Sequence, residues 1–187
     1  GEAFRFAREG LDNEFNKMPR DVDAVLAFLK KKGVTVDETV LLGAGLGANV
    51  AAKSVSFTPD VPALALISPT TNTRDVLTIP AMRVYKGAVL IAAAADDKKT
   101  FLEASVIRNV AYLTTGPGKV TFLTAYDLSS HEMLDKYFIP TVLQWLSAPV
   151  LPEVKPDVVM APAPVEDGAL SVPPSGTEDA LFPSVLE

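Results

Sequence analysis

The segment that decides the fold runs from Thr39 to Asn49 and reads TVLLGAGLGAN. Its first four residues, Thr39–Leu42, form an apolar run of strand length. Three glycines at alternate positions, Gly43, Gly45 and Gly47, then predict a sharp turn. Small residues from about Ala48 to Ser56 favour a helix directly afterwards. The segment therefore predicts a strand, a tight glycine turn and a helix.

The same alternation continues on both sides of this segment. Ahead of it, apolar residues at helical spacing predict a helix that Asp21 caps and that ends at Gly33. After it we expect three further strands, each followed by a helical stretch: Ala63–Ile67, Ala88–Ala94 and Val120–Thr124. Strands separated by helices predict an α/β fold, a three-layer arrangement with a parallel sheet of about four strands.

Composition divides the chain into a body and a tail. Residues 149–187 contain eight of the fifteen prolines, and seven acidic residues against Lys155 alone. The preceding 148 residues balance 16 acidic against 16 basic side chains. We therefore expect an extended N-terminal segment at 1–18, a partial α/β domain at 19–148 and an extended, acidic, proline-rich tail at 149–187.

Composition also excludes several classes of protein. The chain has no cysteine and one histidine, so its scattered carboxylates offer no credible ligand set, and we expect no metal and no cofactor. The longest apolar run, Ala88–Ala95, is far shorter than the roughly 20 residues of a membrane-spanning helix. No basic stripe could neutralise phosphates, so nucleic acid is not an expected partner.

Residues able to do chemistry follow three of the expected strands, where open α/β sheets carry their sites. A strand, Gly-x-x-x-Gly and a helix form the geometry of a nucleophile elbow, whose signature is Gly-x-Ser-x-Gly. Gly45 stands at the serine position, and the N–H of Leu46 stands where an oxyanion donor would be. Asp97 follows the third strand, after Asp96, and His131 follows the fourth.

Together these motifs resemble the C-terminal half of an α/β hydrolase, in the branch of small esterases and dienelactone-hydrolase-like proteins. The segment Gly43–Asn49 is similar to that branch's Gly-Ala-Ser-Leu-Gly-Ala-Asn elbow, with Gly45 replacing the serine. The resemblance implies that Asp97 stands at the acid position and His131 at the base position. Gly1-Glu2-Ala3 resembles the segment after the family's fourth strand, so we expect the first four strands to be absent.

Each of these residues also has another interpretation. His131 could simply pack near the last helix, and the Asp96-Asp97 pair could cap the helix expected from about Thr100. The turn also satisfies the dinucleotide fingerprint as Gly43-x-Gly45-x-x-Ala48. That fingerprint requires an acidic residue after the following strand, where this chain has Ser68-Pro69.

The missing serine predicts a catalytically inactive α/β-hydrolase-like protein that acts as a structural or interaction subunit of a larger assembly. One alternative is a fragment or serine-to-glycine variant of an active carboxylic-ester hydrolase, and a weaker one is a nucleotide-binding module. We expect partner subunits along an open edge of the Thr39–Leu42 strand and through the 149–187 tail. The apolar residues of that tail predict an extended strap across another surface.

Overall fold

The computed structural model describes residues 13–126, 133 and 138–147. Residues 1–12, His131 and the tail at 149–187 lie outside the described residues. What the sequence predicts for them therefore stays a prediction.

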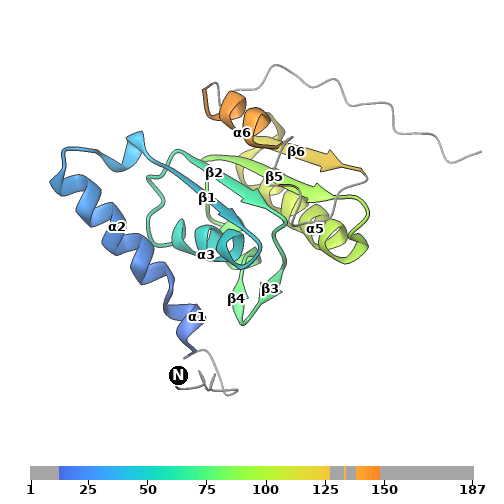
Figure 1. The fold of residues 1–187 in the computed structure, drawn as a ribbon, viewed down its shortest axis with the longest axis horizontal. Coiled ribbons are helices and arrows are strands. Elements are labelled where there is room, and N and C mark those ends of the chain that lie inside the picture. Colours follow the sequence, from blue (N-terminus) through green and yellow to red (C-terminus); the bar gives the residue numbers. More distant parts are fainter. Residues whose placement is uncertain (1–12, 127–132, 134–137, 148–187) are drawn as a thin grey trace, which may run out of the picture. The chain divides into compact units, whose positions relative to one another are not determined.

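A four-stranded parallel sheet lies at the centre of the described fold, in the order β1-β2-β5-β6 (Figure 1). The strands are β1 Val40–Ala44, β2 Ala63–Ile67, β5 Ala88–Ala94 and β6 Val120–Ala125. In their register, Leu42 lies beside Ala65, Ala65 beside Leu90, and Leu90 beside Thr121. The predicted α/β fold with about four parallel strands is confirmed.

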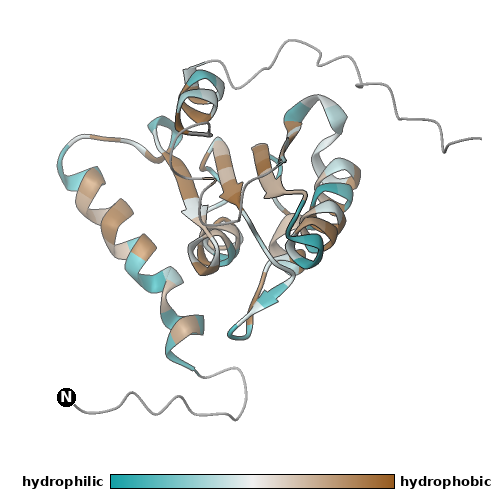
Figure 2. Ribbon diagram, turned by 45° about the vertical axis from the view of Figure 1, so that its right-hand side comes forward, coloured by the Kyte–Doolittle hydropathy of each residue, from teal (hydrophilic) through white to brown (hydrophobic). Residues whose placement is uncertain are grey.

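Helices that connect the strands cover one face of this sheet. These helices are α3 Leu46–Ser54, α4 Ile79–Met82 and α5 Lys98–Thr115. They pack on buried strand residues that include Leu64, Leu66, Val89 and Ile91. Because side chains alternate along a strand, these residues share one face. Figure 2 shows that apolar residues dominate the strands.

The opposite face is covered by helix α6, Phe138–Ser147. Val142 and Trp145 of this helix pack with Met133 against apolar residues of β2 and β5. The indole Nε1 of Trp145 donates a hydrogen bond to Oγ1 of Thr121 on β6, at 3.1 Å. The polar atom of this buried ring therefore has a partner, and the bond attaches α6 to the sheet.

Two helices precede β1. Helix α1, Glu14–Lys17, is a single turn, so the segment 1–18 is helical rather than extended over these residues. Helix α2, Pro19–Lys31, begins two residues before Asp21, which the sequence predicted as its N-cap. Pro19 suits this position because its φ is already fixed and the first N–H groups of a helix lack an acceptor within it. Helix α2 packs against α3.

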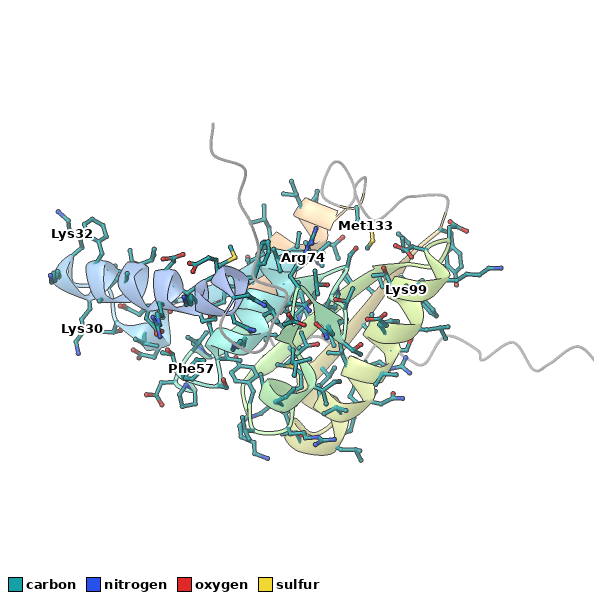
Figure 3. All side chains as sticks on the ribbon, turned by 90° about the horizontal axis from the view of Figure 1, so that it is seen from below. Lys30, Lys32, Phe57, Arg74, Lys99 and Met133 are labelled. Atoms are coloured by element: carbon teal, nitrogen blue, oxygen red, sulfur yellow. The ribbon has the colours of Figure 1, made fainter. Side chains whose placement is uncertain are left out.

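The basic run Lys30-Lys31-Lys32 lies at the C-terminal end of α2, where Figure 3 labels its first and last members. Cations are stabilised there by the helix dipole. The ammonium of Lys32 also lies 5.6 Å from the centre of the Phe28 ring. Across the described ranges, no helix combines the length and the apolar character needed to cross a membrane.

The structure contains a small hairpin that the sequence did not predict. Strand β3, Asn72–Thr73, pairs antiparallel with β4, Val76–Leu77. Arg74 and Asp75 between them have φ values of +53° and +64°. Positive φ at both central residues is typical of a type I′ turn. The usual Asn-Gly signal is absent here, so the sequence does not indicate this turn. Two 3₁₀ turns, η1 Val36–Glu38 and η2 Pro117–Lys119, precede β1 and β6.

Strand β1 lies at one edge of the sheet and, within the described residues, pairs only with β2. The N–H of Gly45 donates to the carbonyl oxygen of Ile67 at 2.9 Å. Since backbone groups alternate in direction along a strand, Leu42 and Ala44 direct theirs to the open side. The side chains of Val40 and Leu42 are 38% and 50% exposed. The described strands thus leave one side of β1 unpaired, and the partner expected along that side stays a prediction.

Candidate functional site

The candidate site lies at the carboxyl ends of the parallel strands. Gly45 follows β1, Ser68 follows β2 and Asp97 follows β5. Two short hydrogen bonds join these ends: Gly45 N–H to Ile67 O at 2.9 Å, and Ser68 N–H to Ala92 O at 2.7 Å. The structure thus brings the glycine turn directly beside the end of β2.

Gly45 connects β1 to α3 through a strained turn. Its φ is +54° and its ψ is −121°, a conformation that residues with a side chain rarely adopt. A Cβ built on Gly45 meets no atom of the described residues within 4 Å. This is the strand–turn–helix geometry of an elbow, and the place where an elbow carries its nucleophile is open space.

Gly43 is required by close packing, whereas Gly47 is not. A Cβ on Gly43 would lie 2.2 Å from the carbonyl oxygen of Gly47 and 2.7 Å from the nitrogen of Ala48. A Cβ on Gly47 would meet no described atom within 4 Å. Among the described residues, close packing therefore requires glycine at position 43 and not at position 47.

Helix α3 begins at Leu46, two residues earlier than the sequence predicted. The first N–H groups of a helix have no acceptor within it, and the helix dipole gives them a partial positive charge. The Leu46 N–H therefore belongs to a helix N-terminus, where a developing negative charge is stabilised. An oxyanion hole combines such a donor with a second one from another loop.

Asp97 is the N-cap residue of α5. Its Oδ1 accepts a hydrogen bond from the N–H of Thr100 at 3.2 Å. The capping interpretation of the aspartate pair is thus confirmed for Asp97, and the exposed Asp96 lies in the turn before it. The acid role of Asp97 stays a prediction because it depends on His131, which lies outside the described residues.

Ser68 is a feature of this edge that sequence reasoning missed. Its φ is +50°, although it is not glycine, and its side chain is buried. Its Oγ donates to the sulfur of Met133 at 3.7 Å, and thioether sulfur is a weak acceptor. The Ser68-Pro69 dipeptide was the only sign in the sequence that the chain turns sharply at this position. A strained, buried hydroxyl therefore lies at the same edge as Gly45.

Asn49, in the first half of α3, fixes the loop that follows β2. Its Nδ2 donates to the carbonyl oxygen of Val76 at 2.9 Å and to Oγ1 of Thr70 at 3.1 Å. Its Oδ1 accepts from the N–H of Thr70 at 3.1 Å. From α5, the carboxylate of Glu103 accepts from the N–H of Thr71 at 2.7 Å. Asn49 therefore has a structural role here.

Ionisable groups give little support for acid–base chemistry at this edge. Burial raises the pKa of Tyr85, whose hydroxyl donates to the carbonyl of Val61 at 2.8 Å. Burial lowers the pKa of Lys53, whose ammonium donates to Oδ1 of Asn16 at 2.7 Å. Both groups serve packing contacts. Among the residues that the structure describes, no three His, Cys, Asp or Glu side chains gather where they could hold a metal ion.

No family model matches the chain, and no curated protein matches it. A similar solved structure is that of MGS-MChE2, an alpha/beta hydrolase enzyme from the metagenome of sediments from the lagoon of Mar Chica, Morocco. The two share 12% sequence identity with a TM-score of 0.53, over 71% of this chain and 69% of that one. At this identity the likeness concerns the fold alone. The described domain therefore has an α/β-hydrolase-like fold.

Proposed function

We propose that this protein is a catalytically inactive α/β-hydrolase-like protein, and that it acts as a structural or interaction subunit of a larger assembly. The observation that carries the proposal is Gly45, which occupies the strained turn between β1 and α3 with no side chain. Ester hydrolysis by this fold needs a nucleophile at that turn. What survives the loss of a triad member comes from the oxyanion hole and from binding, and we expect this chain to lack the second donor of that hole.

Two parts of the chain support the interaction role. The first is the open side of β1, where the backbone groups of the edge strand can pair with another chain. Val40 and Leu42 of the same strand are exposed apolar residues that a partner can cover. The second is the tail 149–187, whose apolar residues and prolines suit an extended strap. In this proposal other protein subunits bind along β1 and through the tail.

The proposal is tested by ester hydrolysis. We expect no turnover of p-nitrophenyl acetate by the natural chain above the rate of the buffer. Gly45→Ser returns a hydroxyl to the turn without adding a second oxyanion donor, so we expect no burst of p-nitrophenol from it either. Gly45→Ala is the matched control for the added side chain. Turnover by the natural chain that Asp97→Asn abolishes would show that the protein is an enzyme.

A second candidate function is that of an active carboxylic-ester hydrolase, seen as a fragment or with its serine replaced. The open space around Gly45 favours it, because a Cβ at this position would meet no described atom within 4 Å. A burst from Gly45→Ser that Asp97→Asn and His131→Ala remove would support this candidate. The weaker nucleotide-binding candidate rests on Gly43-x-Gly45-x-x-Ala48 alone, and isothermal titration with NAD and ATP tests it.

A further inference from the structure

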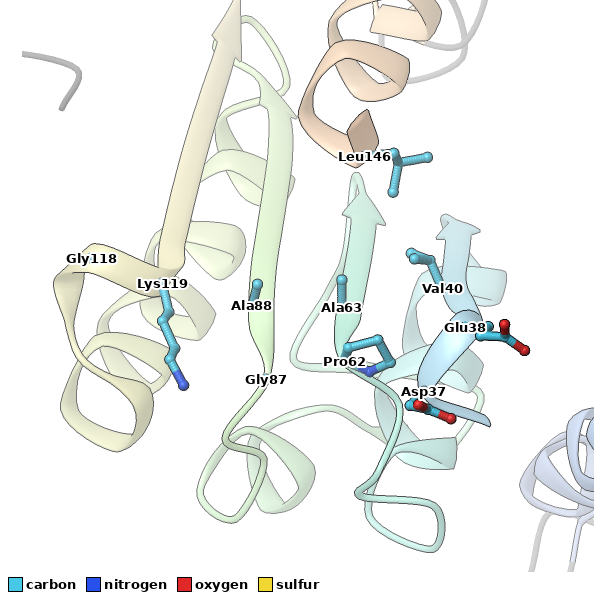
Figure 4. A pocket seen from close by; sticks show the side chains of 10 residues that line it. All are labelled: Asp37, Glu38, Val40, Pro62, Ala63, Gly87, Ala88, Gly118, Lys119 and Leu146. Carbon is cyan, nitrogen blue, oxygen red and sulfur yellow. The ribbon is translucent and has the colours of Figure 1, made fainter. Parts of the chain in front are cut away.

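A hollow of about 590 Å³ lies at the amino ends of the strands, opposite the edge that carries the glycine turn (Figure 4). Residues before or at the start of all four strands line it, together with one residue of α6. The lining is Asp37, Glu38, Val40, Pro62, Ala63, Gly87, Ala88, Gly118, Lys119 and Leu146. The proposed function makes no use of this hollow.

The centre of the hollow is apolar and open to solvent. Pro62 is exposed, Ala88 is half-buried, and Val40 is exposed although it belongs to the sheet. Figure 4 shows Leu146 of α6 on the same side of the sheet as Val40. Apolar surface of this kind gains stability when another apolar group covers it. The hollow therefore favours an apolar occupant.

The two ends of the hollow carry opposite charges (Figure 4). Asp37 and Glu38 lie at the β1 end. A hydrogen bond from the Thr35 side chain lowers the pKa of Asp37, and one from the Thr35 N–H lowers the pKa of Glu38, so both stay ionised near neutral pH. Lys119 lies at the β6 end. An occupant that carries a carboxylate is therefore favoured at the β6 end and disfavoured at the β1 end.

The chain itself carries a segment that matches this pattern. Helix α6 ends at Ser147, one residue after Leu146, so the chain leaves the helix at the rim of the hollow. The residues that follow are Ala148-Pro149-Val150-Leu151-Pro152-Glu153. Five apolar residues are thus followed by one carboxylate.

We propose that residues 148–153 fill this hollow, with the apolar residues across the amino ends of the strands and Glu153 beside Lys119. Neighbouring strands lie about 4.8 Å apart, so crossing from β1 to β6 takes about 14 Å. Five residues in an extended or polyproline conformation span about 15–17 Å. The segment is therefore long enough to reach Lys119.

Proline suits such a segment for two reasons. Its φ is already fixed in the extended region, so the ordering of Pro149 and Pro152 loses less conformational entropy. It also has no N–H, so these two positions bring no backbone donor into an apolar hollow. The charges of Asp37 and Glu38 set the direction in which the segment crosses the hollow. Glu153 would be repelled at the β1 end, so it lies at the β6 end.

Cross-linking tests this placement directly, because the chain has no natural cysteine. We expect the full-length double variant Ala88→Cys, Val150→Cys to form an intramolecular link with a short bismaleimide at several times the yield of Ala88→Cys, Leu170→Cys. The second pair is the matched control, since Leu170 also belongs to the tail. Equal yields for the two pairs would overturn the placement. Links formed only between molecules would assign the hollow to a second copy instead.

Stability gives an independent test on the full chain. Leu151→Asp places a charge in the apolar part of the hollow, so we expect its urea midpoint to fall relative to Leu170→Asp, which should match the natural chain. Glu153→Lys should lower the midpoint more than Glu166→Lys, and added salt should shrink that difference. An unchanged midpoint for both Leu151→Asp and Glu153→Lys would overturn the proposal. Ester hydrolysis by the natural chain would contradict the proposed function, but it would change neither the cross-linking yields nor the urea midpoints. The two proposals are therefore tested separately.

Discussion

A Cβ on Gly43 would lie only 2.2 Å from the carbonyl oxygen of Gly47, so the end of β1 touches the first turn of α3 directly. The atoms that this Cβ would meet belong to the backbone, which has no flexible end that could move aside. We therefore expect Gly43→Ala to lower the free energy of unfolding by about 1–3 kcal/mol or more, as overpacking does. Urea denaturation followed by the fluorescence of Trp145 measures this.

Gly47→Ala is the matched control for that variant. A Cβ there meets no described atom within 4 Å, and position 47 is helical. Alanine is favoured over glycine in a helix by about 0.5–1 kcal/mol, so we expect a neutral or slightly stabilising effect. Equal destabilisation by the two substitutions would contradict the close approach of Gly43 to α3.

Asn49 should be among the most costly polar side chains to remove. Asn49→Ala leaves the buried carbonyl of Val76 and the N–H of Thr70 without their partner, which costs about 1–3 kcal/mol. We also expect faster proteolysis within the β3–β4 hairpin, because this amide fastens the hairpin to α3. Asn72→Ala, at an exposed position of the same hairpin, is the control and should change neither measurement.

Tyr85 should make stability fall at high pH. Burial raises its pKa above the ordinary value of 10.0, so the folded state favours the neutral phenol. The contribution to stability is fully present below about pH 10 and is lost as the pH rises from there toward the folded-state pKa. We expect Tyr85→Phe to flatten the fall in stability between pH 9 and pH 11, as measured by urea denaturation. Tyr126→Phe, at an exposed position, should retain the fall.

The sequence predicted β2 and β5 with the observed bounds, because each is a continuous apolar run, which is typical of a strand covered on both faces. β1 and β6 differ from their predicted bounds by one or two residues. These two strands are less buried, and β6 contains threonines among its apolar residues. The glycine turn was also predictable, since a strand and a helix joined by spaced glycines have few possible connections.

The sequence could not predict features that depend on contacts between distant segments. The positive φ of Ser68 and the Arg74-Asp75 turn have no local signal, because neither uses glycine or asparagine. The structural role of Asn49 depends on hydrogen bonds to Thr70 and Val76, which lie 21 and 27 residues further along the chain. The start of α2 was missed because Asp21 looked like an N-cap, whereas Pro19 suits the first helical position better.

Removal of the tail tests the division into a body and a strap. A chain that ends at Ala148 should still fold, with a cooperative urea transition and the helical circular dichroism of the body. Ordering a segment costs about 1 kcal/mol per residue or more, so the tail gains nothing from order unless it covers apolar surface. We expect the truncated chain to fail to enter its assembly, as measured by size-exclusion chromatography of the native complex. If the truncated chain enters the complex normally, the tail is not the strap that binds partner subunits.

The open side of β1 should tolerate a charge in the isolated chain but not in an assembly. Leu42 is 50% exposed, so Leu42→Lys should change the free energy of unfolding by no more than about 0.5 kcal/mol. Lysine on an edge strand discourages pairing with another strand, because pairing would bury its charge. Sedimentation velocity of the assembly should therefore show dissociation or loss of a partner. Leu102→Lys, on the exposed face of α5, is the matched control and should leave the assembly intact. If Leu42→Lys assembles as well as the natural chain, β1 is not the surface that binds the partner.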